Sequence, residues 1–513
     1  MCIIPESRYA FQTFHYFRDL RRFPVPIRAL RKAARFALAD GGSVKSRVVR
    51  SGFWVGLSEV GNSTLGFVRS IVLARLLTPE IFGVMGLAMI VIRAIETFTR
   101  PGVSQALIAR QHSFEEASGT AFTMLALRGF GIALLLAAVA PWIGDFYDSP
   151  QLPLMLQVLA GAFILGGFRN INTIARQKDL EFRRLTYLSQ VSNFVGTGVT
   201  IFVAWWLRNV WALVIGQLVS ALFGLVLSYV FVPGRPKFEF KREIARDLLR
   251  YGKFITASSI LLYVATEIDS AVIGKVLGHH ELGYYTLAFS IVHMTTTQLA
   301  KVAAGIMMPA YSKLQGNVPG LRRAYLRTLT LVMFAVLPAA LGLMIVADPL
   351  IHVVYGEQWM PAARLLQLLA WFGLFRSLAA FTGYLFEGIG LPKIAFIQGG
   401  VRLAILLPLI VPAALYYGLP GAALTVTAGM AAQWLVGLFY LYKNLGVTFG
   451  QVLKAISQPV WTAALMGGVA WGMMQAVNAH HAGGLAMTII AAGLVYLVPN
   501  LKMLLALKNG KWD

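Results

Sequence analysis

Long, uninterrupted apolar stretches alternate with short polar connections along most of this chain. Fourteen such stretches lie near residues 52–76, 81–100, 117–141, 152–173, 185–206, 210–232, 253–277, 282–309, 328–347, 363–386, 393–413, 420–441, 458–476 and 484–501. Most approach the roughly 20 residues that a helix needs to cross a bilayer. Their apolar residues do not alternate with polar ones, as they would in a membrane β-barrel. The pattern predicts an all-α polytopic membrane protein with about fourteen transmembrane helices.

The distribution of charge refines this prediction. Only 13% of the 513 residues are charged and 57% are hydrophobic, yet the net charge is +23. Residues 1–50 hold eleven Lys and Arg and residues 234–253 hold seven, whereas residues 142–151 and 347–362 hold none. The positive-inside rule places both termini and the basic connections in the cytoplasm. Topology and contact with anionic membrane lipids therefore explain the charge better than nucleic-acid binding does.

The amino-terminal segment is a basic extension rather than a signal peptide. Residues 1–50 carry basic residues throughout and lack a clean apolar stretch before a small-residue cleavage site. Ile27–Leu38 spaces its apolar residues at helical intervals, which fits either a helix on the cytoplasmic membrane surface or a disordered basic extension.

An internal repeat divides the rest of the chain. A shift of 200 positions aligns residues 52–92 with 252–292 without a gap, and Gly83 then coincides with Gly283. We therefore expect a first six-helix lobe and a second one related to it by the repeat. The expected boundaries are a first lobe at 51–233, an amphipathic linker at 234–252, a second lobe at 253–442, and two extra helices with a cytoplasmic tail at 443–513.

Ionisable residues inside apolar stretches are candidates for the functional site, because each is costly in a bilayer unless it faces a cavity or a partner. The candidates for binding an anionic group are Arg69, Arg128, Arg376 and Arg402, and those for ion coupling or gating are Glu59, Glu267 and Asp269. The planar guanidinium of arginine suits phosphate oxygens. Arg93 and Glu96 lie three residues apart and are expected to neutralise each other on one helix face.

Catalytic and cofactor motifs are missing from the sequence. The eight histidines show no metal-ligand spacing, the single cysteine excludes a thiolate cage, and no phosphate-binding loop with its lysine is present. The expectation is a carrier of an anionic substrate, driven by an ion gradient or the membrane potential, with no metal, no cofactor and no enzymatic activity of its own.

Five segments stand out in the sequence: Arg69–Ala88, Gly102–Arg110, Pro141–Leu152, Leu282–Ala288 and Leu337–Ala370, with LLTP after the first stretch, LGYY after the seventh and YGEQW in a later connection. Together they resemble the Wzx-type oligosaccharide flippases of the polysaccharide transport family, in the superfamily of MATE exporters and the lipid II flippase MurJ. The resemblance covers about residues 50–505. It implies two six-helix lobes around a central cavity, in agreement with the repeat.

The resemblance also implies a function. Such proteins move undecaprenyl-pyrophosphate-linked sugars to the outer leaflet of the bacterial inner membrane for polysaccharide biosynthesis. The partners expected here are this lipid-linked oligosaccharide, membrane lipids, a coupling proton or sodium ion, and a polysaccharide polymerase with its export machinery. The alternatives are a MATE-like exporter of cationic drugs, MurJ-like flipping of lipid II, and a membrane glycosyltransferase or polymerase, which the short outer connections disfavour.

A gate follows from the repeat. Asp269 occupies the repeat position of Arg69, which puts opposite charges at matching depths in the two lobes. We therefore expect an outer gate pair between Arg69 and Asp269 when the transporter faces inward. The alternative is that Arg69 extends to the membrane surface and Asp269 makes a local polar contact. Glu267 points about 200° away from Asp269 on a helix, which makes Glu267 the expected lone titrating carboxylate.

Overall fold

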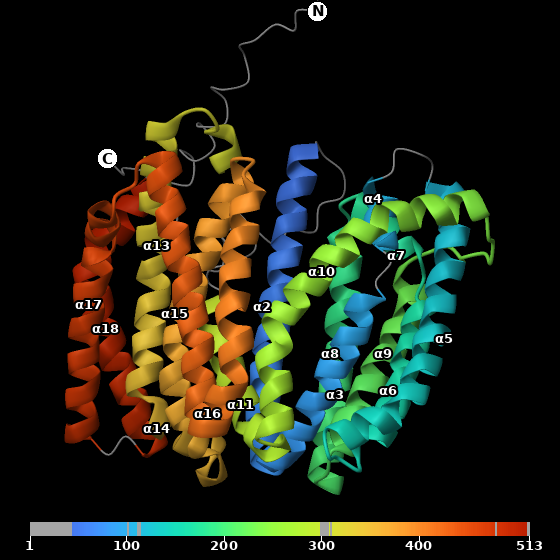
Figure 1. The fold of residues 1–513 in the computed structure, drawn as a ribbon, viewed down its shortest axis with the longest axis horizontal. Helices are drawn as coiled ribbons and strands as arrows, with labels where there is room; N and C mark the ends of the chain where they lie inside the picture. Colours follow the sequence, from blue (N-terminus) through green and yellow to red (C-terminus); the bar gives the residue numbers. More distant parts are fainter. Residues whose placement is uncertain are drawn as a thin grey trace, which may run out of the picture.

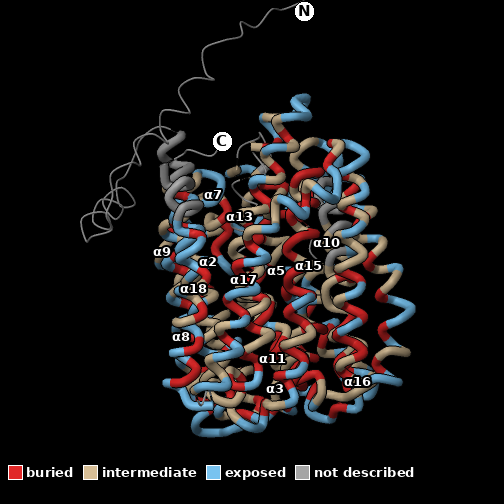
Figure 2. The backbone as a smooth tube through the Cα atoms, turned by 90° about the vertical axis from the view of Figure 1, so that its left-hand side faces the viewer, coloured by how far each residue is buried: buried red, intermediate tan, exposed pale blue. Residues whose placement is uncertain are grey.

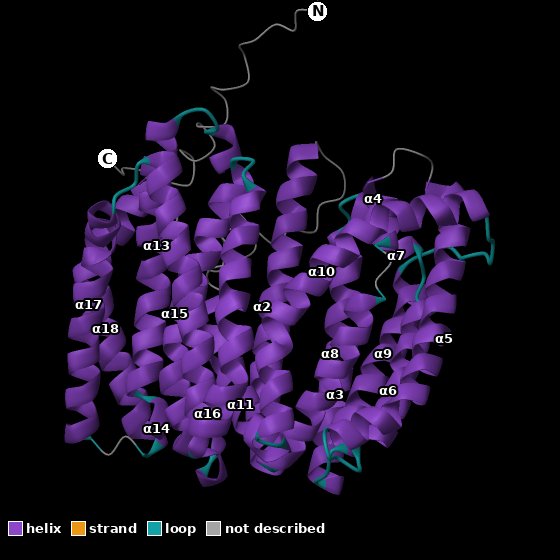
Figure 3. Cartoon of the chain, in the orientation of Figure 1, coloured by secondary structure: helices purple, strands orange, loops and turns teal. Residues whose placement is uncertain are grey.

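The computed structural model describes residues 44–99, 102–109, 114–297, 307, 310–477 and 480–509, and all regular secondary structure in them is helical (Figure 3). We call the helices α2 to α9 the first half: α2 (Val44–Leu76), α3 (Pro79–Phe98), α4 (Val103–Ala109), α5 (Phe114–Phe146), α6 (Leu152–Gly167), α7 (Asn172–Lys178), α8 (Phe182–Leu207) and α9 (Trp211–Phe231).

The second half, here α10 to α16, is followed by two more helices. These elements are α10 (Arg242–Val276), α11 (His279–Val292) with its π-helical extension η2 (His293–Thr297), α13 (Val318–Ile345), α14 (Ala347–Leu350), η3 (Ile351–Tyr355), η4 (Glu357–Trp359), α15 (Pro361–Gly388), α16 (Pro392–Leu445), α17 (Phe449–Ala476) and α18 (Ala482–Asn509). Figure 1 shows the long helices side by side.

Each of the fourteen apolar stretches overlaps a helix. The stretches at 393–413 and 420–441 both fall in α16, which is bent where Gly418 has φ 61° and ψ −149°. Only glycine adopts this backbone conformation readily, and Pro420 lies two residues further on, so the helix is interrupted there. The stretch at 282–309 begins as α11 and η2, and most of its remainder lies outside the described residues.

This is a multi-pass membrane protein. Seven of the described helices are long and apolar enough to cross a membrane, or eight if α6 and α7, which meet at 63°, form one bent span. Buried positions concentrate inside the bundle while the outer surface stays exposed and largely apolar (Figure 2). The exposed aromatic residues that lie toward one end of the bundle are Trp142, Trp205, Trp206, Tyr416, Tyr417 and Trp471. Such a belt is typical of a membrane–water interface.

The two ends of the bundle differ in charge. The end that carries α4, α7 and the segment between α9 and α10, which we call the basic end, lies at the top of Figure 1 and contains most of the connecting Lys and Arg. The opposite end carries α14 and the aromatic belt. Its connections contain Asp145, Asp148, Glu281, Asp348 and Glu357. The bundle is therefore electrically asymmetric along its long axis.

The two halves approach each other most closely between α3 and α11, at the opposite end. A Cβ on Gly83 would lie 1.6 Å from the carbonyl oxygen of His279, and a Cβ on Gly283 would lie 1.9 Å from the carbonyl oxygen of Pro79. These contacts are reciprocal, because Gly83 and Pro79 stand 200 positions before Gly283 and His279. Only glycine lets the two backbones come this close.

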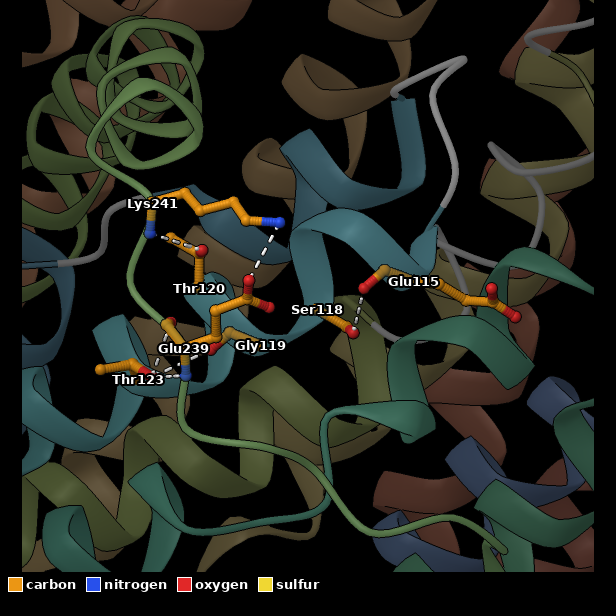
Figure 4. Close-up of polar contacts among 7 residues, drawn as sticks. All are labelled: Glu115, Ser118, Gly119, Thr120, Thr123, Glu239 and Lys241. Carbon is orange, nitrogen blue, oxygen red and sulfur yellow. Dashed lines mark hydrogen bonds and ion pairs between the residues drawn. The ribbon is translucent and has the colours of Figure 1, made fainter.

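The segment between the halves is attached to the first half by hydrogen bonds (Figure 4). The Lys241 amide donates to Thr120 Oγ1 over 3.1 Å, and the Glu239 amide donates to Thr123 Oγ1 over 3.2 Å. Thr123 Oγ1 also donates to the Glu239 carbonyl. The Lys241 ammonium lies 2.9 Å from Glu239 Oε1, and this hydrogen bond and charge pairing raise the pKa of Lys241.

The amphipathic part of the expected linker belongs to α10, which begins at Arg242 and continues into the seventh apolar stretch. Leu248 is buried against an apolar cluster that includes Val103, Leu107 and Phe122 of the first half, and Ile244 packs on the same cluster. The basic start of α10 is thereby held against the basic end of the first half. The predicted surface helix Ile27–Leu38 lies outside the described residues, and α2 already begins at Val44.

Candidate functional site

A cavity of about 430 Å³ lies between the two halves. Arg69 of α2, Arg93 of α3 and Gln217 of α9 line it from the first half, and Ser290 of α11 and Tyr355 of η3 line it from the second. We call it the central cavity. Most of its lining is apolar, and the few polar side chains within it mark it as a candidate site for a ligand that carries a polar group.

Arg69 presents an unpaired cation to this cavity. Its side chain forms no hydrogen bond or ion pair with any other described residue, and it also lines a neighbouring cavity of about 220 Å³ inside the first half. Asn62, Asn193 and Ser220 line that second space, which we call the side cavity. A cation without a protein partner is costly within a membrane-embedded bundle unless water or an anionic ligand meets it.

Arg93 pairs with Glu267 across the interface between α3 and α10. Arg93 Nη2 lies 3.0 Å from Glu267 Oε2. Two predictions are therefore wrong for this structure. Arg93 is neutralised by Glu267 rather than by Glu96, and Glu267 is not a lone carboxylate. The residues stand 174 positions apart, so no local spacing in the sequence could reveal the pair.

Asp269 is instead the carboxylate without an ion pair to hold it. Its side chain is fully buried in α10, where Oδ2 accepts a hydrogen bond of 2.6 Å from the Tyr285 hydroxyl. Oδ1 is buried and has no partner among the described residues. Arg402 of α16, also buried, is close enough to interact electrostatically with Asp269, but its Nε has no hydrogen-bond acceptor in the described part of the chain.

Arg376 of α15 joins this group. Its guanidinium lies 5.7 Å from the centre of the Phe372 ring and interacts electrostatically with Asp269 and Arg402. Together with the Arg93–Glu267 pair, the group contains three arginines and two carboxylates. We call this group the buried cluster after its two buried members, Asp269 and Arg402, although Arg93 is exposed. It is spread over α3, α10, α15 and α16, carries one surplus positive charge and can therefore attract an anion.

Arg128 has a different environment from the other candidate arginines. Its Nε donates to the Thr99 carbonyl over 3.0 Å, and its Nη2 donates to the Glu96 carbonyl over 3.0 Å and to Thr99 Oγ1 over 3.2 Å. It therefore caps the carboxyl end of α3, where carbonyl groups lack helical partners. The guanidinium is largely occupied by this role.

The expected pair between Arg69 and Asp269 is not formed in this structure, because Asp269 is buried against Tyr285 while Arg69 faces the central cavity. Other residues near the end of α2 make contacts between the halves at the opposite end. Arg75 donates to the Val353 carbonyl and, over 2.9 Å, to the Val354 carbonyl.

Glu59 and Arg169 lie apart from the groups described above. Glu59 is exposed on α2, has no ion pair with any described residue, and does not line the central or side cavity. Arg169 lines a third cavity in the first half, just after the end of α6. It was not among the predicted site residues, although it lies inside the apolar stretch at 152–173. No group of three metal-ligating side chains occurs among the described residues.

Comparison with known proteins identifies the family. The model of the family described as polysaccharide biosynthesis protein matches residues 72–364. The chain belongs to this family. The lipopolysaccharide biosynthesis protein WzxC of Escherichia coli is 24% identical over 425 residues, which cover 82% of this chain and 86% of that protein. The succinoglycan biosynthesis transport protein ExoT of Rhizobium meliloti is 25% identical over 352 residues, or 68% of this chain and 71% of that protein.

The fold of this polysaccharide biosynthesis protein is also found among solved structures. The lipid II flippase MurJ in an inward closed conformation superposes with a TM-score of 0.69 and covers 86% of this chain and 97% of that chain. Its identity of 14% means that the likeness shows the fold alone. The predicted resemblance to this family is confirmed.

Proposed function

We propose that this protein is a flippase, not an enzyme, that moves an undecaprenyl-pyrophosphate-linked oligosaccharide across the bacterial inner membrane for polysaccharide biosynthesis. The observation that carries the proposal is the unpaired guanidinium of Arg69 in a cavity between the two halves of a polysaccharide biosynthesis family member. A pyrophosphate is the anionic part of such a substrate, and arginine binds its oxygens in a bidentate manner.

The surplus charge of the buried cluster supports the same substrate. Arg376 and Arg402 lack hydrogen-bonded acceptors among the described residues, and we assign them to the pyrophosphate together with Arg69 once the halves rearrange. Arg128 contributes by fixing the end of α3. A MATE-like exporter of cations would favour a cavity rich in carboxylates, so the excess of arginine argues against it.

The proposed orientation places the basic end in the cytoplasm, with both termini there and fourteen spans in all. The charge difference between the two ends supports it. The proposed repeat of two six-helix halves is supported by the reciprocal contacts of Gly83 and Gly283, which join equivalent backbone positions. Rocking of the halves about this contact would open the central cavity to one side of the membrane at a time.

Coupling to a proton or sodium ion is assigned to Asp269, because its Oδ1 is buried and unpartnered among the described residues. Glu267 is already engaged by Arg93, and Glu59 remains a candidate on α2. After flipping, the lipid-linked oligosaccharide would pass to a polysaccharide polymerase and its export machinery on the outer face.

The test is a flipping assay with the purified full chain in liposomes. A fluorescent undecaprenyl-pyrophosphate-linked oligosaccharide is added, and a membrane-impermeant quencher reports the fraction in the outer leaflet over time. We expect fast exchange with the wild type, a loss of at least tenfold with Arg69→Ala or Arg402→Ala, and partial recovery with Arg402→Lys, which keeps the charge but loses the planar fork.

Arg364→Ala is the control, because Arg364 is exposed at the opposite end and has no partner among the described residues. Labelled lipid II and a fluorescent organic cation are run in parallel. Transport of lipid II in preference to the oligosaccharide lipid would favour the MurJ-like alternative. Transport of the cation alone would favour the MATE-like one and overturn the proposal.

A further inference from the structure

A third cavity, larger than the central and side cavities, lies inside the first half, toward the basic end. It has a volume of about 540 Å³, within the range of about 300–1,000 Å³ that is usual for small-molecule sites. Residues near the basic ends of α3, α5, α6, α8 and α9 surround it, with Gly102 and Ser104 from the α3–α4 connection and α4. We call it the inner cavity. It is separate from the central cavity, in which the pyrophosphate was placed.

The inner cavity is lined by polar groups that have no protein partner. Gln105, Ser189, Gln217 and Arg169 form no side-chain hydrogen bond or ion pair with any other described residue. Gln105 and Ser189 are half-buried, whereas Gln217 and Arg169 are exposed. Polar groups without protein partners inside a membrane-embedded bundle are met by water or by a polar ligand. Amide and hydroxyl groups of this kind match the hydroxyl groups of a saccharide, each of which both donates and accepts.

The charged groups of the inner cavity add a preference for acidic sugars. Arg169, Arg128 and the carboxylate of Glu96 face it, so the lining carries one surplus positive charge. Arg128 is held by the end of α3. Arg169 is free to bind, because its guanidinium forms no hydrogen bond or ion pair with any other described residue. A carboxylate substituent on a sugar is the natural partner for such a guanidinium.

The position of the inner cavity fits a substrate that reaches from the central cavity into the first half. Gln217 lines the inner, side and central cavities, and Arg69 lines the side and central ones. Asn193 and Ser220 line both the inner and side cavities, and Asn193 is held in place by donating to Asn62 Oδ1 over 2.9 Å. The three spaces thus follow one another from the interface between the halves toward the basic end.

We propose that the inner cavity is a saccharide subsite, in which Gln105, Ser189 and Gln217 bind sugar hydroxyls and Arg169 binds the carboxylate of an acidic sugar. The proposal rests on the proposed function, because it takes the pyrophosphate of the same substrate to lie at Arg69. It assigns selection of the sugar to the first half, whereas the arginines of the central cavity and buried cluster bind the part common to all such lipids.

The test compares three lipids for binding to the full chain in nanodiscs, by competition with a fluorescent undecaprenyl pyrophosphate. The competitors are undecaprenyl pyrophosphate, the same lipid carrying a glucosyl-glucose disaccharide, and the same lipid carrying a glucuronosyl-glucose disaccharide. The wild type should bind the sugar-bearing lipids more tightly than the sugar-free lipid, and the glucuronosyl lipid most tightly. Arg169→Gln should reduce the preference for glucuronosyl over glucosyl lipid by about tenfold, the cost of one charged hydrogen bond.

A cavity-filling variant tests the location without removing any polar group. Gly166 lines the inner cavity, and a Cβ there would meet nothing within 4 Å, so Gly166→Leu can fill the space without a backbone clash. It should abolish the gain in affinity from either disaccharide. The matched control is Gly131→Leu, since Gly131 is equally open on α5 but does not line the cavity. It should leave all three affinities unchanged.

The outcomes separate the two proposals. If the wild type binds none of the three lipids, the proposed function fails. If it binds all three equally, or if Gly166→Leu leaves the gain from the sugars intact, the saccharide subsite is wrong while the flippase proposal stands. If Arg169→Gln weakens all three lipids by the same factor, Arg169 binds pyrophosphate instead, which also overturns the assignment.

Discussion

Arg75 and Lys275 stand 200 positions apart, and each crosses to the opposite half of the molecule. Arg75, at the end of α2, donates to the carbonyl groups of Val353 and Val354 in η3. Lys275, at the end of α10, lies 2.8 Å from Asp148 Oδ2 in the connection between α5 and α6. The two contacts are therefore equivalent under the proposed repeat. They join the halves at the opposite end, the end that carries α14 and lies at the bottom of Figure 1.

Removing both contacts should ease opening at the opposite end. Hydrogen bonds of a charged group contribute about 1.5–3 kcal/mol when shielded and exposed ion pairs about 0–1 kcal/mol, so Arg75→Ala with Lys275→Ala should favour the open form about tenfold. The measurement is the rate at which a cysteine at Ser63, which lines the central cavity, reacts with an impermeant maleimide added from that side. Cys2 is first replaced by Ser.

The control is again Arg364→Ala, a cation lost from the same end without a partner among the described residues. It should leave the labelling rate unchanged. Equal rates in the double variant and the wild type would show that these contacts do not hold the halves together.

Gly83 and Gly283 predict a stability effect that is the same in both halves. A methyl group on either would press within 2 Å of a carbonyl oxygen of the other half, which forces the backbones apart and costs about 1–3 kcal/mol. Gly83→Ala and Gly283→Ala should each lower the melting temperature of the purified protein in detergent by several degrees. Gly198→Ala, where a Cβ meets nothing within 4 Å, should not. A normal melting temperature for either interface variant would contradict the close contact.

The apolar pattern predicted the helices well. A long apolar stretch inside a membrane must pair its own backbone N–H and C=O groups, and a helix does this within one segment. It did not predict that the bend at Gly418 lies within one helix. It also missed the start of α10 at Arg242, because the amphipathic and apolar parts of α10 differ in composition but not in backbone conformation. The repeat alignment paired Gly83 with Gly283, and these two glycines make reciprocal contacts in the structure.

The candidate site was less predictable, because pairing depends on which helices meet. Four predicted residues, Arg376, Arg402, Glu267 and Asp269, share one buried cluster. Arg69 and Asp269 were expected at the same depth in the membrane, but they do not meet. Depth alone does not determine which side of its helix a residue occupies or which helix it faces. Nor does sequence distinguish an arginine that caps a helix from one that faces a cavity.

Arg128 and Arg169 allow that distinction to be tested by stability. Arg128→Ala removes three hydrogen bonds at the carboxyl end of α3 and leaves carbonyl groups without donors, at about 1–3 kcal/mol for each buried group. The melting temperature in detergent should fall by several degrees. Arg169→Ala should leave it unchanged, because Arg169 has no partner among the described residues to lose. A larger fall in melting temperature for Arg169→Ala than for Arg128→Ala would show that Arg128 does not have the capping role.

Asp269 should carry the response of transport to an ion gradient. Its carboxylate is fully buried, with one oxygen bonded by Tyr285 and the other without a partner in the described residues. Asp269→Asn keeps the shape and the acceptor for Tyr285 but cannot bind a proton or balance a sodium ion. In the liposome assay, an imposed proton or sodium gradient should accelerate flipping by the wild type severalfold and leave the Asn variant at its gradient-free rate.

Glu267→Gln is the decisive comparison, because Glu267 lies two residues away but is held by Arg93 at 3.0 Å. Losing that ion pair should slow flipping with and without the gradient by a similar factor, so the ratio of the two rates stays near that of the wild type. Tyr285→Phe removes the hydrogen bond to Asp269 while keeping its carboxylate, and the response to the gradient should persist. A gradient response that survives in Asp269→Asn and disappears in Glu267→Gln would assign coupling to Glu267 instead.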